Sequence, residues 1–325
     1  TIEMLKLNTD RDLIVDGSLY GMGKSAGNAP IELLAMHLNE NYGGAYDINQ
    51  ILEAIDINIM PIYEKQYWGY GLNFYISAKN DCHPTYVKHL MDKRTLSIKA
   101  INEILGKINL EKRLSFNKQY IEDLYMEYML ETQDDASCME RLSAELIGKE
   151  LILVGPGKSA LDDARKIEEY RKSGDFTTIA VNFLPDNIKV DYLFLSNSKR
   201  YSLMTPFIVG CCAKIIATSN ITPVKGRFEY TIGYADLISD FDEIWDNALV
   251  ILLNLLKRIG AKKVYLVGFD GFKENPDNNY VDRSFDLSKS FEYLSAVNRL
   301  LTKKIKEYSK DMDIVFLTNS IYAGE

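Results

Sequence analysis

The sequence predicts an α/β protein whose C-terminal half is a doubly wound, mostly parallel, Rossmann-like sheet. From residue 151 onward, apolar runs of strand length recur, and longer helical segments lie between several of them. Alternation of helices with strands that are apolar throughout is typical of a parallel sheet covered on both faces. The length of 325 residues fits two domains.

The elements expected in this half follow from the same patterning. Strands are expected at 151–155, 177–183, 190–196, 213–218, 263–268 and 313–318. Helices are expected at 159–172, 243–259 and 288–309.

The N-terminal third opens with a different unit, a short strand followed by a glycine-rich loop and a helix. Leu13, Ile14 and Val15 form the apolar run, and a helical face continues after Pro30. Free N–H groups at a helix start attract anionic oxygens, and glycines let a ligand approach the backbone. A tight turn that needs positive φ angles at its glycines is the alternative. The candidate ligand-binding residues are Asp16, Ser18, Gly21, Gly23, Gly27 and Asn28.

The middle of the chain indicates helices and a domain boundary. Residues 63–75 are rich in aromatic residues and glycine, and helical patterning resumes at 85–90 and 97–108. Charged helices fill 111–148, with a polar break at 133–135 that we expect to be solvated. We therefore expect domains at 1–110 and 149–325, joined by a helical linker at 111–148.

Composition excludes several classes of partner. The formal net charge is −8 and is spread along the chain, which argues against nucleic-acid backbones as partners. No run of about 18 apolar residues predicts a membrane span, and the first ten residues lack a signal-peptide pattern. The four cysteines (Cys82, Cys138, Cys211 and Cys212) have neither CxxC nor zinc spacing. We expect a cytoplasmic protein with a small-molecule substrate, no membrane partner, and an oligomeric state left open.

The residues around the glycine-rich loop carry a resemblance to a known family. The string IVDGSLYGMGKSAGN at 14–28, with Glu32-Leu33-Leu34 after it, closely resembles the last barrel strand and helix of 4-hydroxy-2-oxovalerate aldolases. These belong to the pyruvate-aldolase and HMG-CoA-lyase-like metallolyases. Residues 69–75 and 87–90 look like the segment that leans over the family's active site. The resemblance covers about 1–110 and implies the end of an incomplete (β/α)8 barrel with a helical extension.

The chemistry that this resemblance implies is metal-assisted cleavage of a carbon–carbon bond. In the family, Mn2+ or Mg2+ chelates a pyruvate enolate while a 4-hydroxy-2-oxo acid splits into pyruvate and an aldehyde, and the metal acts as a Lewis acid. Residues 16–27 match one carboxyl end of a barrel strand, where such sites lie. By position, Asn28 would orient a ligand and Tyr70 would be a catalytic residue beside the substrate carbonyl. Alternatives are a helix N-cap for Asn28 and a packed aromatic for Tyr70.

The metal ligands of the family do not match residues of this chain. The family holds its metal with an acidic residue after the first strand and a His-x-His pair near the seventh. The only histidines here, His37, His83 and His89, are not paired in that way. We expect no complete metal site, a structural His37, and at most a weak cluster of His83 with Asp81 and Cys82. The resemblance therefore indicates part of a longer lyase that is inactive by itself.

The first strand of the C-terminal half runs into a turn resembling a phosphate loop. Gly157, Lys158 and Ser159 match the end of the Walker pattern, but Ile152 stands where the pattern needs its first glycine. What remains is a strand, a Gly-Pro-Gly turn beginning at Gly155, and a helix N-terminus. That arrangement suits a phosphate-bearing ligand at the carboxyl edge of a sheet.

Polar residues follow other expected strands, at the edge where ligands of open α/β sheets bind. Asn182, Asn197 and Asp270 each lie at or just beyond such a strand end. The pattern loosely resembles the Rossmann-like domains of bacterial sialyltransferase-like and pterin pyrophosphokinase-like proteins. Asp270 would bind a ribose or a metal, or would be a turn residue that caps its strand. The expected nucleotide or nucleotide-sugar site comprises Gly155, Gly157, Lys158, Ser159, Asn182 and Asp270.

Three hypotheses for the function remain open at this point. The first is a pyruvate-aldolase portion fused to a nucleotide- or sugar-handling domain. The second is a nucleotide- or nucleotide-sugar-dependent transferase in which the C-terminal domain is active and the barrel portion inert. The third is a non-catalytic scaffold. Residues preceding Thr1 that supply a His-x-His pair and an Arg-Asp strand would favour the first.

Overall fold

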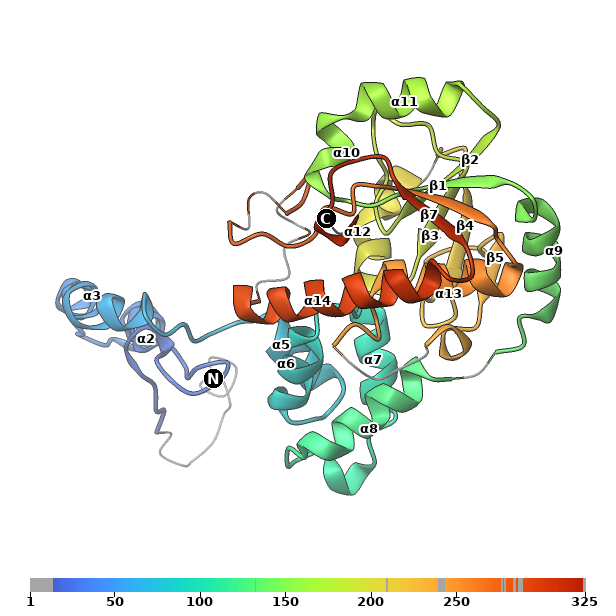
Figure 1. Ribbon diagram of the computed structural model, residues 1–325. Helices are drawn as coiled ribbons and strands as arrows, with labels where there is room; N and C mark the ends of the chain where they lie inside the picture. Colours follow the sequence, from blue (N-terminus) through green and yellow to red (C-terminus); the bar gives the residue numbers. More distant parts are fainter. Residues whose placement is uncertain are drawn as a thin grey trace. The chain divides into compact units, whose positions relative to one another are not determined.

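The computed structural model describes residues 14–323 except 132, 209, 239–242, 276, 278, 283–284 and 286–288. The chain forms two compact units (Figure 1). The first, called here the N-terminal unit, comprises Thr1–His89 and Ile108–Lys118. The second, the α/β unit, comprises Leu90–Lys107 and Gln119–Glu325.

The described part of the N-terminal unit is helical. Asp47 is the N-cap of α3, and its side chain accepts a hydrogen bond from the N–H of Gln50. Gly43, with a φ of 67°, is the C-cap of α2. Both are standard helix ends. The elements are η1 (Leu19–Gly21), α2 (Ile31–Tyr42), α3 (Ile48–Ala54), η2 (Ile55–Ile59), α4 (Met60–Tyr63), α5 (Leu72–Lys79), α6 (Pro84–Asp92, which continues into the α/β unit) and η3 (Leu110–Lys112).

The prediction of a strand at residues 13–15 is wrong for the two residues that the structure describes, Ile14 and Val15. Ile14 and Val15 lie in irregular backbone, Ile14 is 88% exposed, and Leu13 falls outside the described residues. A parallel strand needs a neighbouring strand for its hydrogen bonds. In the described part of the N-terminal unit, the extended pairing found is the single bridge between Ser18 and Pro30. The barrel end therefore stays a prediction.

The second half of the N-terminal unit is organised around Tyr86, whose side chain is fully buried. Its hydroxyl donates to the carbonyl of Ser115 at 2.8 Å and accepts from the N–H of Asn117 at 3.1 Å. The ring lies 5.2 Å from that of Phe116. A buried tyrosine with its hydroxyl paired ties the 108–118 segment to α6.

The α/β unit is built on a seven-stranded parallel sheet in the order β5-β4-β3-β2-β1-β6-β7 (Figure 1). Every pairing among these strands is parallel. The strands are β1 (Glu150–Val154), β2 (Phe176–Val181), β3 (Tyr192–Leu195), β4 (Lys214–Thr218), β5 (Tyr230–Ile232), β6 (Lys263–Val267) and β7 (Asp313–Phe316). All six expected strands are present, and the Rossmann-like α/β architecture is confirmed.

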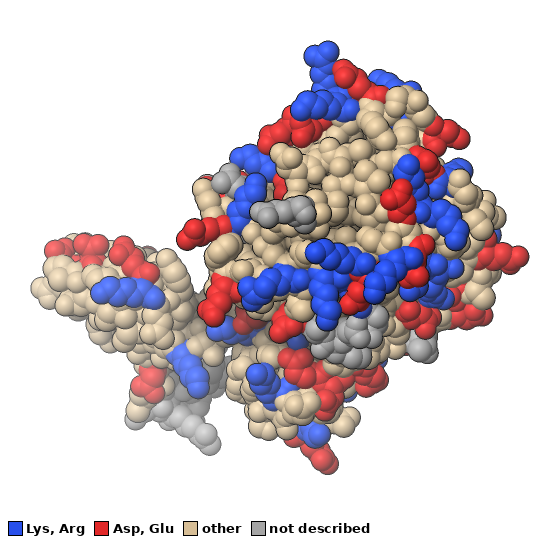
Figure 2. Space-filling view, in the orientation of Figure 1, with Lys and Arg blue, Asp and Glu red and all other residues tan. Residues whose placement is uncertain are grey.

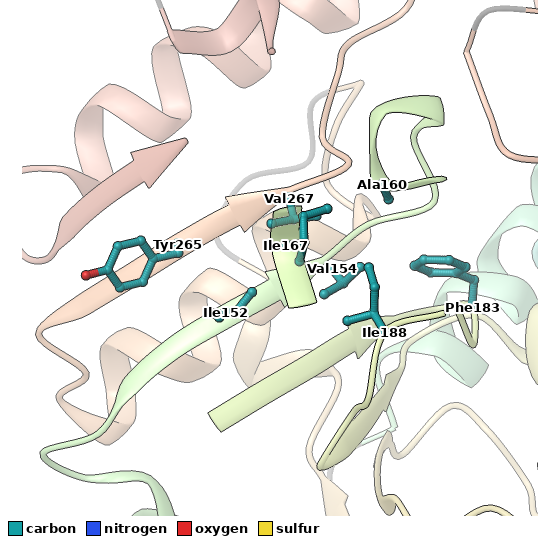
Figure 3. Close-up of a cluster of buried hydrophobic side chains, with 8 residues drawn as sticks. All are labelled: Ile152, Val154, Ala160, Ile167, Phe183, Ile188, Tyr265 and Val267. Atoms are coloured by element: carbon teal, nitrogen blue, oxygen red, sulfur yellow. The ribbon is translucent and has the colours of Figure 1, made fainter. Parts of the chain in front are cut away.

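Helices cover both faces of this sheet. On one face, Ile152 and Val154 pack with Ile167 of α11 in a cluster of buried side chains (Figure 3). Successive strand residues point to opposite faces, so Leu151 and Leu153, which are also fully buried, lie on the other face. Apolar residues on both sides of one strand explain why these strands read as continuous apolar runs.

The helices of the α/β unit differ in places from the expected ones. The expected helix at 159–172 is two helices that break at Asp163, and the helix expected at 243–259 begins only at Ala248. The helices are α7 (Ile98–Gly106), α8 (Lys118–Met129), α9 (Ala136–Leu146), α10 (Lys158–Asp162), α11 (Ala164–Lys172), α12 (Ser198–Ile208), η4 (Ala235–Leu237), α13 (Ala248–Ile259), α14 (Phe291–Tyr308) and η7 (Ile321–Ala323).

Charged side chains are concentrated along α14. Lys and Arg side chains follow α14 on the face that Figure 2 shows, with acidic side chains interspersed.

Asp135, in the break expected to be solvated, is instead buried and accepts a hydrogen bond from the N–H of Gly233 at 2.7 Å. Among the described residues, no helix has both the length and the apolar character needed to cross a bilayer.

Candidate functional site

A cavity of about 480 Å3 lies in the α/β unit at the carboxyl edge of the sheet. Four of its walls are segments that follow β1, β2, β3 and β6. From β1 the chain adds β2 to β5 on one side, and it then returns to place β6 on the other side of β1. This reversal is a topological switch point, the position at which ligands bind in open α/β sheets. We call this space the switch-point cavity.

Segments outside the sheet complete the walls. Lys93 and Tyr125 line it from the region of α6 and α8, and Tyr293 lines it from α14. The loop before α13 adds Trp245 and Asp246. The cavity therefore combines aromatic faces with charged groups, as small-molecule sites do.

The two glycines after β1 are explained by a close approach of backbones. The N–H of Gly155 donates to the carbonyl of Val267, and the N–H of Gly157 donates to that of Gly268, both at 2.8 Å. A Cβ on Gly157 would lie 2.4 Å from the Gly268 oxygen, and one on Gly155 would lie 2.7 Å from the Phe269 ring. Any side chain there would force the loops apart. Gly157 lines the switch-point cavity, whereas Gly155 is not among the lining residues.

The N-terminus of α10, where a phosphate was expected, is filled by Asp270. This carboxylate accepts from the N–H of Ser159 at 2.9 Å and from the Ser159 hydroxyl, and it is 6% exposed. A carboxylate at this position satisfies the helix N–H as a bound anion would. A phosphate would have to displace it. Asp270 therefore caps α10, a role that the sequence analysis did not predict. Lys158 is not among the residues that line the cavity.

Asn182 and Asn197 line the switch-point cavity, and their side chains also form hydrogen bonds that stabilise its walls. Asn182 has a φ of 55°, a left-handed conformation that asparagine tolerates. Its amide oxygen accepts from the N–H of Ser196 at 2.9 Å, and its amide nitrogen donates to the Ser196 hydroxyl at 3.1 Å. The Asn197 side chain accepts from the N–H of Arg200 at 3.1 Å. The two amides thus fix the ends of β2 and β3 and the start of α12.

Among the residues that the structure describes, three cations line the cavity: Lys93, Arg200 and Lys289. The Lys93 ammonium lies 2.8 Å from the Glu122 carboxylate and 4.0 Å from the centre of the Tyr125 ring. Burial lowers the pKa of Arg200 from its usual range. These positive groups would attract an anionic ligand to the cavity.

Asp246 is a candidate functional residue that the sequence analysis missed. Burial raises the pKa of this carboxyl, and the nearby charges of Lys93 and Lys289 oppose the rise. A carboxyl with a perturbed pKa in a cavity is a candidate for proton transfer. The sequence signal was its place just before Asn247, the N-cap of the strongly apolar α13.

The glycine-rich loop of the N-terminal unit closes on itself. The N–H of Ser18 donates to the carbonyl of Ala29 at 3.0 Å, and the N–H of Asn28 donates to that of Gly21 at 2.9 Å. The Asn28 amide donates to the carbonyl of Met22 at 2.9 Å. Asn28 therefore does not cap α2, whose N-cap is Pro30, and that alternative is wrong.

The glycines of this loop fit the tight-turn interpretation. Gly21 and Gly27 have φ values of 60° and 81°. A Cβ on Gly27 would lie 2.5 Å from the Gly21 oxygen, and one on Gly23 would lie 2.8 Å from the Asn28 amide nitrogen. Asp16 is exposed. The ligand-binding roles of these residues stay predictions.

The structure gives the exposure of Tyr70 and the hydrogen-bonding neighbours of two histidines. Tyr70 is 87% exposed, so the packed-aromatic alternative is wrong for it. His37 Nδ1 lies 3.1 Å from the side-chain nitrogen of Asn41, and His83 Nδ1 accepts from the N–H of Thr85 at 3.2 Å. Within the described ranges, no group of three or more His, Cys, Asp or Glu side chains is arranged to hold a metal.

Comparison with protein-family models and with curated proteins found no match to this chain. The fold and the cavity therefore define its class: a protein with a Rossmann-like parallel sheet and a ligand-sized cavity at the switch point.

Proposed function

We propose that the α/β unit binds a nucleotide or nucleotide-sugar in the switch-point cavity and acts as a transferase. The observation that carries this proposal is the position of the cavity beside β1 and β6, where the strand order reverses. Its volume of about 480 Å3 falls within the range of small-molecule sites.

The lining suggests how such a ligand is held. Trp245 and Tyr125 offer aromatic faces to a base or a sugar. Lys93 and Lys289 offer positive charge to phosphates, and Asp270 keeps phosphates away from α10 through like-charge repulsion. We therefore expect the phosphates to lie beside the two lysines and not at the glycine turn.

Asp246 suits the general base of the transfer. It would take the proton from an acceptor hydroxyl while the acceptor oxygen attacks the anomeric carbon, and the nucleotide would leave with the electrons of the broken bond. A carboxyl whose pKa is raised by burial holds a proton more readily than an exposed one. This step needs no other reactant than donor and acceptor.

The proposal is tested by titrating the chain with nucleoside diphosphates and their sugar conjugates in a calorimeter. We expect one base class to bind with one site per chain, and Lys289→Met to weaken binding about tenfold. Lys303→Met is the matched control, because Lys303 is exposed on α14 and is not among the cavity-lining residues. Absence of binding by every nucleotide, or equal effects of the two substitutions, would refute the proposal.

A second candidate function concerns the N-terminal unit, as part of a Mn2+- or Mg2+-dependent pyruvate aldolase. More than half of the exposed large apolar residues lie between Ile14 and Tyr75. We infer that part of this exposed apolar surface packs against further protein. This supports the proposal that the unit completes a barrel supplied by residues outside the chain.

This second candidate is tested on the product of the complete open reading frame that encodes this chain, called here the extended protein. We expect the extended protein to release pyruvate from a 4-hydroxy-2-oxo acid with Mn2+, and Tyr70→Phe to reduce the turnover at least tenfold. The chain as it stands should release none. Pyruvate release by the present chain, or none by the extended protein, would contradict the proposal.

A further inference from the structure

A second cavity, of about 470 Å3, lies in the α/β unit and has no role in the function proposed so far. It is enclosed by α10 and the start of α11, by residues 182–188 after β2, by α12, and by Val281, Asp282 and Phe285. Enclosure by four segments makes it concave on several sides. That shape and volume are those of a small-molecule site and not of a flat protein interface.

The lining of this second cavity is mostly apolar. Leu161, Leu203 and Phe207 are 53%, 49% and 70% exposed, although large apolar side chains gain free energy when they leave water. The apolar lining residues are Ala160, Leu161, Ala164, Phe183, Leu184, Pro185, Ile188, Leu203, Met204, Phe207, Val281 and Phe285. An aliphatic group is therefore the ligand chemistry that this surface favours.

The second cavity adjoins the switch-point cavity. Asn182, Arg200 and Phe285 line both. The Arg200 guanidinium lies 4.1 Å from the centre of the Phe285 ring and donates to the Phe285 carbonyl at 2.8 Å. Two polar side chains and an aromatic ring thus stand between a mostly apolar space and one that has more polar and charged groups. A ligand that spans the two spaces needs an apolar end and a polar end.

We propose that the second cavity binds the aliphatic chain of an amphiphilic acceptor, whose hydroxyl-bearing head group reaches past Arg200 into the switch-point cavity. The acceptor role rests on the proposed transferase function, whereas the binding of the chain does not. This arrangement would bring the acceptor hydroxyl to the cavity that holds the nucleotide-sugar. It would also give a role to the three large apolar side chains that this surface exposes.

The probe is n-octyl-β-D-glucoside, kept below its micellar concentration, with methyl-β-D-glucoside as the head group alone. Titration of the chain in a calorimeter should show one site for the octyl compound and none for the methyl compound. Phe207→Ser should weaken octyl binding at least fivefold, because Phe207 lines the cavity yet is exposed enough for the fold to survive its loss. Leu110→Ser, at an exposed position in the other unit, is the control and should change nothing.

The outcomes separate this inference from the proposed function. Octyl binding that Phe207→Ser weakens supports the site. No octyl binding, or a dimer of the chain that Phe207→Ser dissociates, overturns it, since a second copy then covers the surface. Nucleotide titrations done in parallel test the proposed nucleotide site in the switch-point cavity. If nucleotides bind and the octyl probe does not, only this inference fails. If the probe binds and no nucleotide does, the acceptor role is overturned together with the transferase.

Discussion

The carboxylate of Asp270 accepts hydrogen bonds from both the backbone N–H and the hydroxyl of Ser159, which lies 111 residues earlier in the chain. This pair joins the loop after β6 to the helix after β1 across the switch point. The same carboxylate thus caps α10 and forms part of the cavity wall. Its removal should have consequences for both stability and anion binding.

Asp270→Ala should lower the free energy of unfolding by about 1–3 kcal/mol, because the partly buried N–H of Ser159 loses its partner. Asp270→Asn keeps one acceptor oxygen and should cost less. Urea denaturation measures both, with Asp175→Ala, at an exposed site, as the control. If Asp270→Ala were as stable as Asp175→Ala, the capping role would be wrong.

Gly157→Ala should destabilise the α/β unit by about 1–3 kcal/mol, because its Cβ would lie 2.4 Å from the Gly268 oxygen. The matched control is Gly106→Ala, at the end of α7, where a Cβ meets nothing within 4 Å. That substitution should be neutral or stabilise by up to about 1 kcal/mol. Thermal unfolding of the two variants compares their melting temperatures. Equal melting temperatures would show that the loops after β1 and β6 can move apart.

Much of the α/β unit could be predicted from the sequence because its strands are buried on both faces. Such strands are apolar throughout, which made six of the seven visible. The seventh, β5, has three residues, Tyr230–Ile232, and was missed because so short a segment carries no periodic signal. The opposite error occurred at Ile14 and Val15, where an apolar pair without a neighbouring strand stayed irregular.

The candidate site was predictable only where it lies at strand ends. Gly157, Asn182 and Asp270 were found by that rule, because parallel strands bring their carboxyl ends to one edge. Lys93 and Asp246 were missed because they come from loops that only tertiary packing brings to the cavity. The sequence also could not show that Asp270 occupies the helix N-terminus offered to a phosphate.

Glu145→Gln tests an ionic anchor between α9 and the sheet. The Glu145 carboxylate accepts from Lys214 Nζ at 2.7 Å, from the Tyr230 hydroxyl at 2.8 Å and from the Tyr192 hydroxyl. Its hydrogen bond to Lys214, followed by those to the tyrosines, lowers its pKa from 4.5 to about 2. A lowered pKa stabilises the folded state above pH 4.5, and that stability is lost as the pH falls toward 2.

At pH 7 Glu145→Gln should therefore cost about 1–2 kcal/mol, a range reduced for the partial exposure of the group. When urea denaturation is repeated, the cost should be almost unchanged at pH 5 and clearly smaller at pH 3, which lies between the two pKa values. Glu140→Gln, at an exposed position on the same helix, is the control. A cost that does not change with pH would show that Glu145 acts through packing and not through its charge.

Asp246→Asn should have the opposite pH dependence. Burial raises the pKa of Asp246, so the folded state holds this proton to a higher pH than the unfolded state, whose carboxyl titrates near 3.8. Ionisation in the fold therefore costs free energy that grows as the pH rises through this window and is absent below it. The asparagine variant should match the unsubstituted protein at pH 3 and exceed its stability at pH 7 by about 0.5–2 kcal/mol. Urea denaturation at both pH values checks this, with Asp175→Asn as the control. A variant that is less stable at pH 7 would mean that Lys93 and Lys289 outweigh the burial, and Asp246 would then be a structural partner of these lysines instead of a strained carboxyl kept for proton transfer.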